Sequence, residues 1–151
     1  MAWQTYELDR KAQQLVLNAK KRDVDSLNQA YKMRMAVAYG LERFWGEHLR
    51  LQQREPDKSK YWKETWDTLV TVMAKAGVTI PNDKIKNHDD KKKEEKSKRT
   101  IQEIEAMSEK LWSIPIEDQR VAIAVLTQLC DCLVWWTQRY KGKNDIRPDD
   151  E

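Results

Sequence analysis

A row of basic side chains is the feature of this sequence whose residue types and spacing suggest chemistry. Placed on one helix, with about 100° between successive residues, the row falls within about 40° and consists of Lys32, Arg43, Arg50 and Arg54. Ala36, Tyr39 and Gly46 lie along the same line, where small residues would let a nucleic-acid backbone approach closely. Contacts from cations to phosphates fix position without reading sequence. This basic row therefore predicts a non-specific nucleic-acid surface, and an ordinary solvated helix face is the alternative.

A second basic group stands near residue 20, at the end of the first expected helix. Its members, which would extend the basic row, are Lys20, Lys21 and Arg22. Cations at this position also suit the negative end of a helix dipole. The whole chain has a formal net charge of +3 and a pI near 8.8. Such a mild excess permits nucleic-acid binding without requiring it.

Arg43 and His48 form the one enzyme-like pair in the chain. An arginine, four residues and a histidine within a helical domain resembles the motif of HEPN ribonucleases, in which the two residues act across a dimer on the RNA backbone. That family usually has a polar residue after the arginine, where this chain has Phe44. His48 also falls within the apolar arc of its expected helix. We therefore expect a packed histidine and a surface arginine, with the ribonuclease as the alternative.

Other catalytic and ligand-binding patterns are absent from the sequence. It has no glycine loop for phosphates, no Cys/His spacing for a metal and no Ser-His-Asp candidate set. Cys130 and Cys132 lie two residues apart on one expected helix, about 200° around it, so they cannot bridge each other. No catalytic residue, metal or cofactor is predicted. The absence of a visible signal peptide makes a cytoplasmic location the default expectation.

The segment from Ile116 to Lys141 is the element around which these residues must be positioned. It lies between Pro115 and Gly142 and reads as one long helix. Apolar side chains cover most of its circumference, which predicts a central helix surrounded by other helices. We expect it to be too short for a membrane span, which takes about 20 apolar residues, because Gln128 and Asp131 interrupt it.

Two adjacent tryptophans on this segment face different ways on the helical wheel. Trp136 lies in the apolar arc and is expected in the core. Trp135 lies in the polar arc. Because an exposed tryptophan is a frequent anchor at protein interfaces, Trp135 is predicted to contact a neighbouring subunit.

The rest of the chain predicts further helices. Helical periodicity and breaks at Pro56, Gly77 and Pro81 place them at about residues 3–21, 25–54, 57–76 and 100–112. Asp23 or Asp25 can cap the second of these helices. Residues 82–99 carry eight Lys or Arg and five Asp or Glu, and we expect a mobile charged loop there. The fold class is therefore an all-α, single-domain bundle of about five helices over residues 1–142, followed by a disordered tail, 143–151.

The C-terminal part also resembles a known family. The segment IPIEDQRVAIAVLTQLCDCLVWWTQRYKGK, with the charged lead-in KKKEEKSKRTIQEIEAMSEKLWSIP, is similar to the small subunits of CRISPR effector complexes over about residues 91–143. The type I-D small subunit, which can be made from an internal start in the large-subunit gene, is compatible with a chain that opens on a helix at Met1, Ala2 and Trp3.

The resemblance implies a non-enzymatic antiviral-defence subunit of a Cascade-like surveillance complex. Such subunits stack with copies of themselves and with backbone subunits, and they offer a basic groove to the guide–target duplex or the displaced strand. The implied partners are guide RNA, target DNA or RNA and other effector subunits, with no membrane. A helical adaptor with no nucleic-acid role is a further alternative. The resemblance carries no binding motif, so the basic row rests on residue spacing alone.

Overall fold

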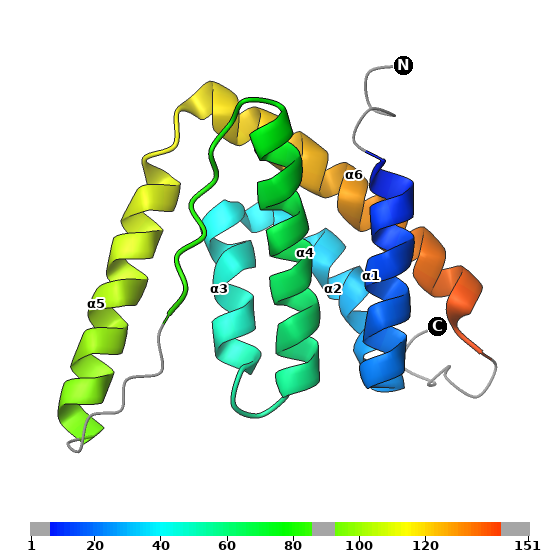
Figure 1. Ribbon diagram of the computed structural model, residues 1–151, viewed down its shortest axis with the longest axis horizontal. Helices are drawn as coiled ribbons and strands as arrows, with labels where there is room; N and C mark the ends of the chain where they lie inside the picture. Colours follow the sequence, from blue (N-terminus) through cyan, green and yellow to red (C-terminus); the bar gives the residue numbers. More distant parts are fainter. Residues whose placement is uncertain (1–6, 86–92, 143–151) are drawn as a thin grey trace.

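The computed structural model describes residues 7–85 and 93–142, and every regular element in that part is helical (Figure 1). The prediction of an all-α bundle is confirmed. The elements are α1 (Leu8–Arg22), η2 (Val24–Asn28), α2 (Gln29–Ala36), η3 (Val37–Tyr39), α3 (Leu41–Leu51), α4 (Pro56–Lys75), α5 (Lys93–Trp112) and α6 (Ile116–Tyr140), of which η2 and η3 are 3₁₀ helices. The predicted tail, 143–151, lies outside the described residues.

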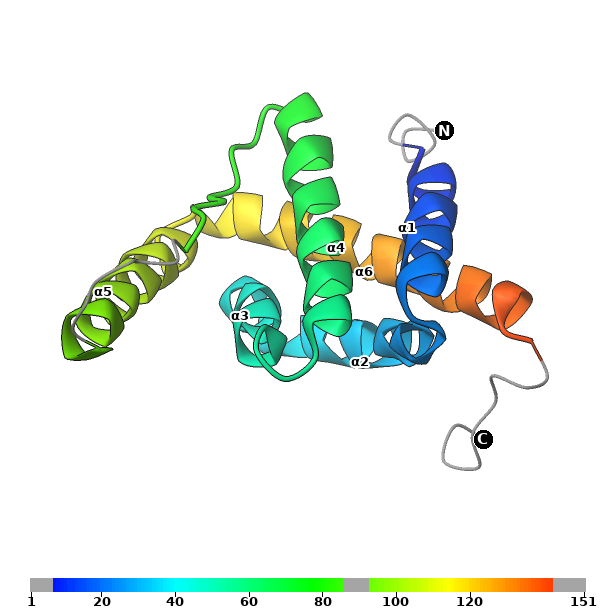
Figure 2. The same ribbon diagram turned by 60° about the horizontal axis from the view of Figure 1, so that its bottom comes forward.

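Helix α6 runs behind α1, α2 and α4 and joins them into one bundle (Figures 1 and 2). Its fully buried apolar face consists of Ala122, Leu126, Leu129, Cys130 and Leu133. The opposite face is open, because Val121 and Trp135 are both about half exposed. The expectation that other helices surround α6 is therefore wrong, since they cover it on one side.

The length of α6 corrects a second expectation. Its 25 residues are enough, by length and composition alone, to cross a membrane, so the segment is not too short. A core helix meets the same criterion, and one face of α6 packs against α1 and α2. Asp131, near its middle, forms an ion pair with Arg34 of α2, with 2.6 Å between Oδ1 and Nε.

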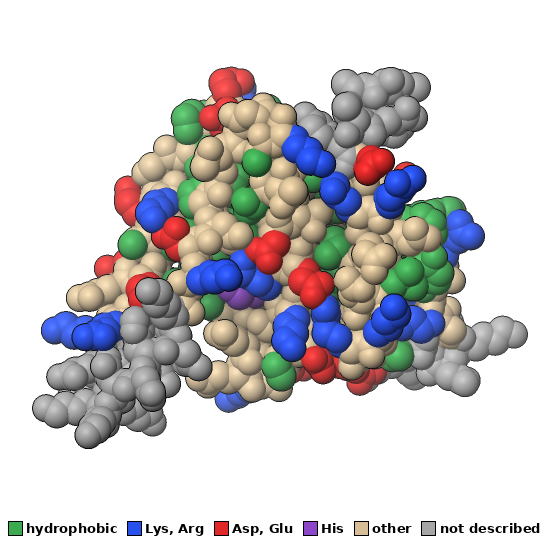
Figure 3. All heavy atoms as spheres, viewed as in Figure 1, with side chains coloured by type: hydrophobic (Ala, Val, Ile, Leu, Met, Phe, Trp, Pro, Cys, Tyr) green, Lys and Arg blue, Asp and Glu red, His purple; other side chains and the backbone are tan. Residues whose placement is uncertain are grey.

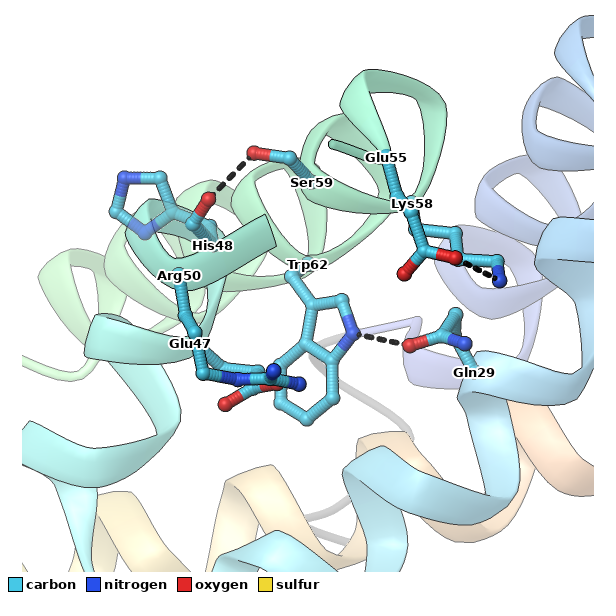
Figure 4. Close-up of polar contacts among 8 residues, drawn as sticks. All are labelled: Gln29, Glu47, His48, Arg50, Glu55, Lys58, Ser59 and Trp62. Carbon is cyan, nitrogen blue, oxygen red and sulfur yellow. Dashed lines mark hydrogen bonds and ion pairs between the residues drawn. The ribbon is translucent and has the colours of Figure 1, made fainter. Parts of the chain in front are cut away.

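Helices α3 and α4 form an antiparallel pair around an aromatic cluster. The rings of Phe44 and Trp62 lie 4.9 Å apart, and Trp66 is fully buried beside them. Trp62 donates its indole N–H to Oε1 of Gln29 on α2, at 2.8 Å (Figure 4). The hydrogen bond satisfies a buried polar atom and ties α4 to α2.

The segment expected as one helix over 25–54 is broken at Gly40, and that prediction is wrong. Gly40 has φ 96° and ψ 174°, a conformation that only glycine adopts at little cost. Helix α2 and the short η3 end before it, and α3 starts in a new direction (Figure 2). Asp23 caps the start of this region, since its carboxylate accepts from the backbone N–H of Asp25 at 3.1 Å.

Helix α5 corrects the prediction of a mobile loop over 82–99. It begins at Lys93 rather than near residue 100 and packs on α3 through the buried side chains of Met107 and Leu111. Two more residues of the expected loop make polar contacts. Asn82 bonds with Lys63 and Asp67, and Asp83 forms an ion pair with Lys110 at 2.5 Å. Residues 86–92 lie outside the described part of the chain.

Candidate nucleic-acid interface

A groove lies where the chain bends between α2 and α3. Its volume is about 590 Å³, and its lining includes Trp62 of α4, which is almost fully buried. Along its sides are Lys32, Met35, Ala36, Tyr39, Arg43, Glu47 and Arg50. Three members of the predicted basic row therefore share one hollow, with a single carboxylate among them.

Arg43 and Tyr39 form the first rim of the groove. The Arg43 guanidinium carbon lies 5.0 Å from the centre of the Tyr39 ring, a cation–π arrangement. Tyr39 is 67% exposed, and Met35, one turn earlier, is 73% exposed. The contact holds the guanidinium in place while leaving both groups open to a ligand. Large exposed side chains beside a fixed cation are suited to sugar and base contacts next to a bound phosphate.

Arg50 and Glu47 lie on the second rim, one turn apart on α3. Arg50 donates to Oε1 of Glu47 from Nε, at 2.8 Å, and also from one terminal nitrogen. Figure 4 shows both side chains beside Trp62, on the opposite side of α3 from His48. The bond is charge-assisted and raises the pKa of Arg50. Glu47 therefore partly neutralises one of the three groove cations.

Lys32 on α2 adds the third cation to the groove. Its side chain is exposed, and its charge acts on Glu55 near the start of α4. The pKa of Glu55 is lowered first by a hydrogen bond from Lys58, drawn in Figure 4, and further by the charges of Lys32 and Arg50. The positive potential of this region thus reaches the neighbouring turn.

The remaining predicted binding residues lie elsewhere. Arg54 is exposed in the turn after α3 and does not line the groove. Lys20 donates to the carbonyl oxygen of Tyr140 at 2.5 Å, and Arg22 is paired with Glu64 in a half-buried position. Lys21 is exposed at the end of α1. The structure does not join these residues to the groove.

The face formed by α1 and α4 contrasts with the groove. Figure 3 shows Lys and Arg side chains interspersed there with Asp and Glu. Arg22 with Glu64 and Lys63 with Asp67 are ion pairs of this face. Opposite charges at such spacing cancel over short distances. This face should therefore attract a nucleic-acid backbone more weakly than the groove does.

His48 lies on the side of α3 opposite the groove and is 8% exposed. Its Nδ1 bonds with the carbonyl oxygen of Trp45, and its own carbonyl accepts from Ser59 Oγ at 2.6 Å. Burial lowers the pKa of His48. Because Arg43 points into the groove, the two residues of the ribonuclease-like pattern are not brought together within one chain.

The two cysteines are held as thiols in α6. Cys130 is buried and Cys132 is half-buried. Burial, with a contribution from Asp9, raises the pKa of Cys132 to about 12, and burial also raises the pKa of Cys130. Within residues 7–85 and 93–142, no cluster of three or more His, Cys, Asp or Glu side chains is arranged to hold a metal ion.

Sequence reasoning missed two residues of the groove. Met35 gave no signal, because an isolated exposed methionine is indistinguishable from a core residue in a helical pattern. Trp62 belongs to the apolar stripe of its helix, as the periodicity indicates, but its place in the lining of the groove depends on the bend at Gly40. On the wheel, Tyr39 lies along the basic row and Glu47 lies at its edge. Both residues line the groove.

Comparison with known proteins gives no relative: no family model, curated protein or solved structure matches this chain. The class that the fold defines is an all-α bundle, and its groove presents three cations, one carboxylate and an exposed aromatic ring.

Proposed function

We propose that this protein is a non-catalytic helical subunit that binds a nucleic-acid backbone without sequence specificity through the groove between α2 and α3. The observation that carries the proposal is the convergence of Lys32, Arg43 and Arg50 on one hollow beside an exposed Tyr39. Cations gathered in a concave site reinforce one another's attraction for phosphates. Contacts from cations to phosphates fix position without reading sequence, so we infer binding to unrelated sequences alike.

The assembly that we propose is a CRISPR RNA-guided surveillance complex. Support comes from the similarity of about residues 91–143 to the small subunits of such complexes, together with the all-α fold. Its partners would be guide RNA, target DNA or RNA, other effector subunits and copies of the chain itself. Purification from the native host tests this part. Recovery of guide RNA with large effector subunits is expected, and recovery of unrelated partners would contradict it.

Binding is tested with a groove variant that combines Lys32→Gln, Arg43→Gln and Arg50→Gln. Affinity for labelled RNA and DNA of mixed sequence is measured by fluorescence anisotropy over a range of salt concentrations. We expect weaker binding to all sequences and a flatter salt dependence, by up to about 0.9 in log–log slope for each duplex phosphate that the variant no longer neutralises. The control variant combines Arg10→Gln, Lys60→Gln and Lys75→Gln, which removes the same charge from exposed positions outside the groove.

The basic segment 91–99 is the competing site, and it needs its own variant. Replacing its six Lys and Arg residues with Gln should leave most of the affinity if the groove dominates. If binding disappears in this variant and persists in the groove variant, the groove is an ordinary solvated surface and the proposed site is wrong. If neither the unmodified protein nor any of its variants binds nucleic acid, the helical-adaptor alternative is favoured.

The ribonuclease alternative predicts a different outcome. The proposed non-catalytic role means that RNA incubated with the protein in the absence of metal ions stays intact. Cleavage that is abolished by both Arg43→Ala and His48→Ala would overturn this role. The burial of His48 and its bond to Trp45 favour a packing function for this side chain.

A further inference from the structure

The open face of α6 carries a pattern of residues that is symmetric about Gln128. Counting outward by seven residues gives Val121 and Trp135, and counting outward by eleven gives Glu117 and Arg139. Seven and eleven residues are close to two and three full turns, so all five side chains lie within an arc of about 40°. This open seam lies opposite the buried face of α6, and each of its five members is exposed.

The two apolar members of the open seam are large enough to act as interface anchors. Trp135 is 54% exposed and Val121 is 46% exposed. Between them lie Gln128 and Ala124, and Ala124 is small enough to let another helix approach closely. Exposed tryptophans are enriched among residues that dominate binding energy.

We propose that the open seam is a two-fold interface on which a second copy of this chain docks, with the two α6 helices antiparallel and Gln128 at the axis. In this register Val121 of each copy faces Trp135 of the other, and Glu117 of each faces Arg139 of the other. Every contact is therefore made twice across the axis. In each apolar contact Val121 of one copy meets Trp135 of the other, and in each charged contact an acid meets a base. Such self-complementarity is what an isologous dimer requires.

The geometry of helix packing fits this register. Glu117 and Arg139 lie eleven residues, or about 16.5 Å, from Gln128. At a shallow crossing of about 20° the two helices separate by only several ångströms over that distance, which long Glu and Arg side chains can span. Asp131, beside the seam, is already paired with Arg34 within its own chain, so its own charge has a partner under the second copy.

Glu117 and Arg139, the charged residues at the two ends of the seam, make only weak contacts within their own chain. These contacts can be exchanged for contacts with the second copy. Glu117 lies 3.4 Å from Arg120 in an exposed pair, and Arg139 lies over the Trp136 ring at 5.2 Å. Exposed pairs of this kind contribute little to stability. A lipid surface is a poorer occupant than a second copy, because Gln128, Glu117 and Arg139 would all have to enter it.

Sedimentation equilibrium of the full chain tests the pairing, and it does so independently of nucleic-acid binding by the groove. We expect a concentration-dependent dimer that Trp135→Ala weakens on the order of thirtyfold, because the side chain is used twice. Glu117→Arg and Arg139→Glu should each weaken it about tenfold. The two exchanges combined in one chain should restore dimerisation, which a merely structural role would not produce.

Cross-linking tests the register. In a Cys132→Ser background, Gln128→Cys should form an intermolecular disulfide on oxidation, because residue 128 faces itself across the axis. The control is Gln102→Cys on α5, which is exposed but has no such symmetry. A monomer at all concentrations, a dimer unaffected by Trp135→Ala, or a double charge exchange without recovery would each overturn the proposal. The proposal would also be overturned if Trp135→Ala abolished binding to phosphatidylglycerol vesicles but left the dimerisation of the chain unchanged.

Discussion

Glu47 provides the sharpest test of the groove, because its removal should strengthen binding rather than weaken it. Its carboxylate accepts from Arg50 at 2.8 Å and lies among the three groove cations. A phosphate bound on the far side of the Arg50 guanidinium would lie roughly 7 Å from that carboxylate. The repulsion at this distance is about 0.6 kcal/mol with the screening of bulk water and about 2.4 kcal/mol with an effective dielectric constant of 20.

Glu47→Gln removes this repulsion and frees Arg50 for the backbone. Affinity at low salt should therefore rise by about threefold at least, and by up to about fiftyfold if the groove excludes most water. The salt dependence should steepen by up to one phosphate contact, because an additional cation becomes available. Stability should change by less than about 0.5 kcal/mol, since exposed pairs one turn apart contribute little.

Anisotropy titrations of the Glu47→Gln variant at several salt concentrations measure both effects. The matched control is Glu105→Gln, an exposed position on α5 with the same change in net charge. Glu105→Gln should alter affinity only slightly, through the long-range field. An equal gain in both variants would attribute the effect to net charge. Weaker binding by Glu47→Gln would refute the assignment of the groove as the phosphate site.

Three further predictions follow from burial and backbone geometry. Burial lowers the pKa of His48 below its usual 6.5, so in mildly acidic solution the unfolded chain binds more protons than the folded one. The unfolding free energy should therefore fall as pH drops below about 6.5. His48→Gln should reduce the slope of unfolding free energy against pH, measured by denaturation between about pH 5 and 7. Chemical denaturation should show a loss of about 3–5 kcal/mol for Trp66→Ala, which is fully buried, and a clearly smaller loss for the monomer of Trp135→Ala, which is 54% exposed. Equal losses would contradict the burial pattern. Gly40→Ala should cost about 1–3 kcal/mol through its positive φ alone, because an added Cβ meets no atom within 4 Å, whereas Gly46→Ala within α3 should be neutral or stabilising.

Helix α6 shows how far the sequence predicts the fold. Its bounds, Ile116–Tyr140, agree with the prediction within one residue, because Pro115 and Gly142 punctuate a continuous helical pattern. The wheel also separates Trp135, which is exposed, from Leu133 and Leu129, which are buried. The helical wheel does not show how many other helices pack against α6. Apolar residues over most of the circumference suggested neighbours on all sides, whereas α1, α2 and α4 pack against one face only.

The start of α5 shows that helix propensity can extend a helix beyond its buried part. The charged residues that precede Thr100 have little apolar surface to bury, which favoured a mobile loop. Lys and Glu are nevertheless good helix formers, and a helix begun at Lys93 continues into residues that pack on α3. A helix can extend beyond its packed part at little cost, because each further residue adds a backbone hydrogen bond once the helix is nucleated.

The bend at Gly40 changes what the basic row can do. On an unbroken helix, Lys32 to Arg54 would form a straight line of about 33 Å that follows a backbone over several phosphates. A wheel assumes one continuous helix, and a lone glycine in a helical pattern is usually tolerated, so the sequence did not signal the break. The bend moves Lys32 and Arg43 to the sides of one hollow and leaves Arg54 outside it. The array is therefore compact, and the greatest decrease in salt slope that the groove can produce falls from four neutralised phosphates to three. A measured decrease of four on changing the whole basic row would favour the straight line over the groove.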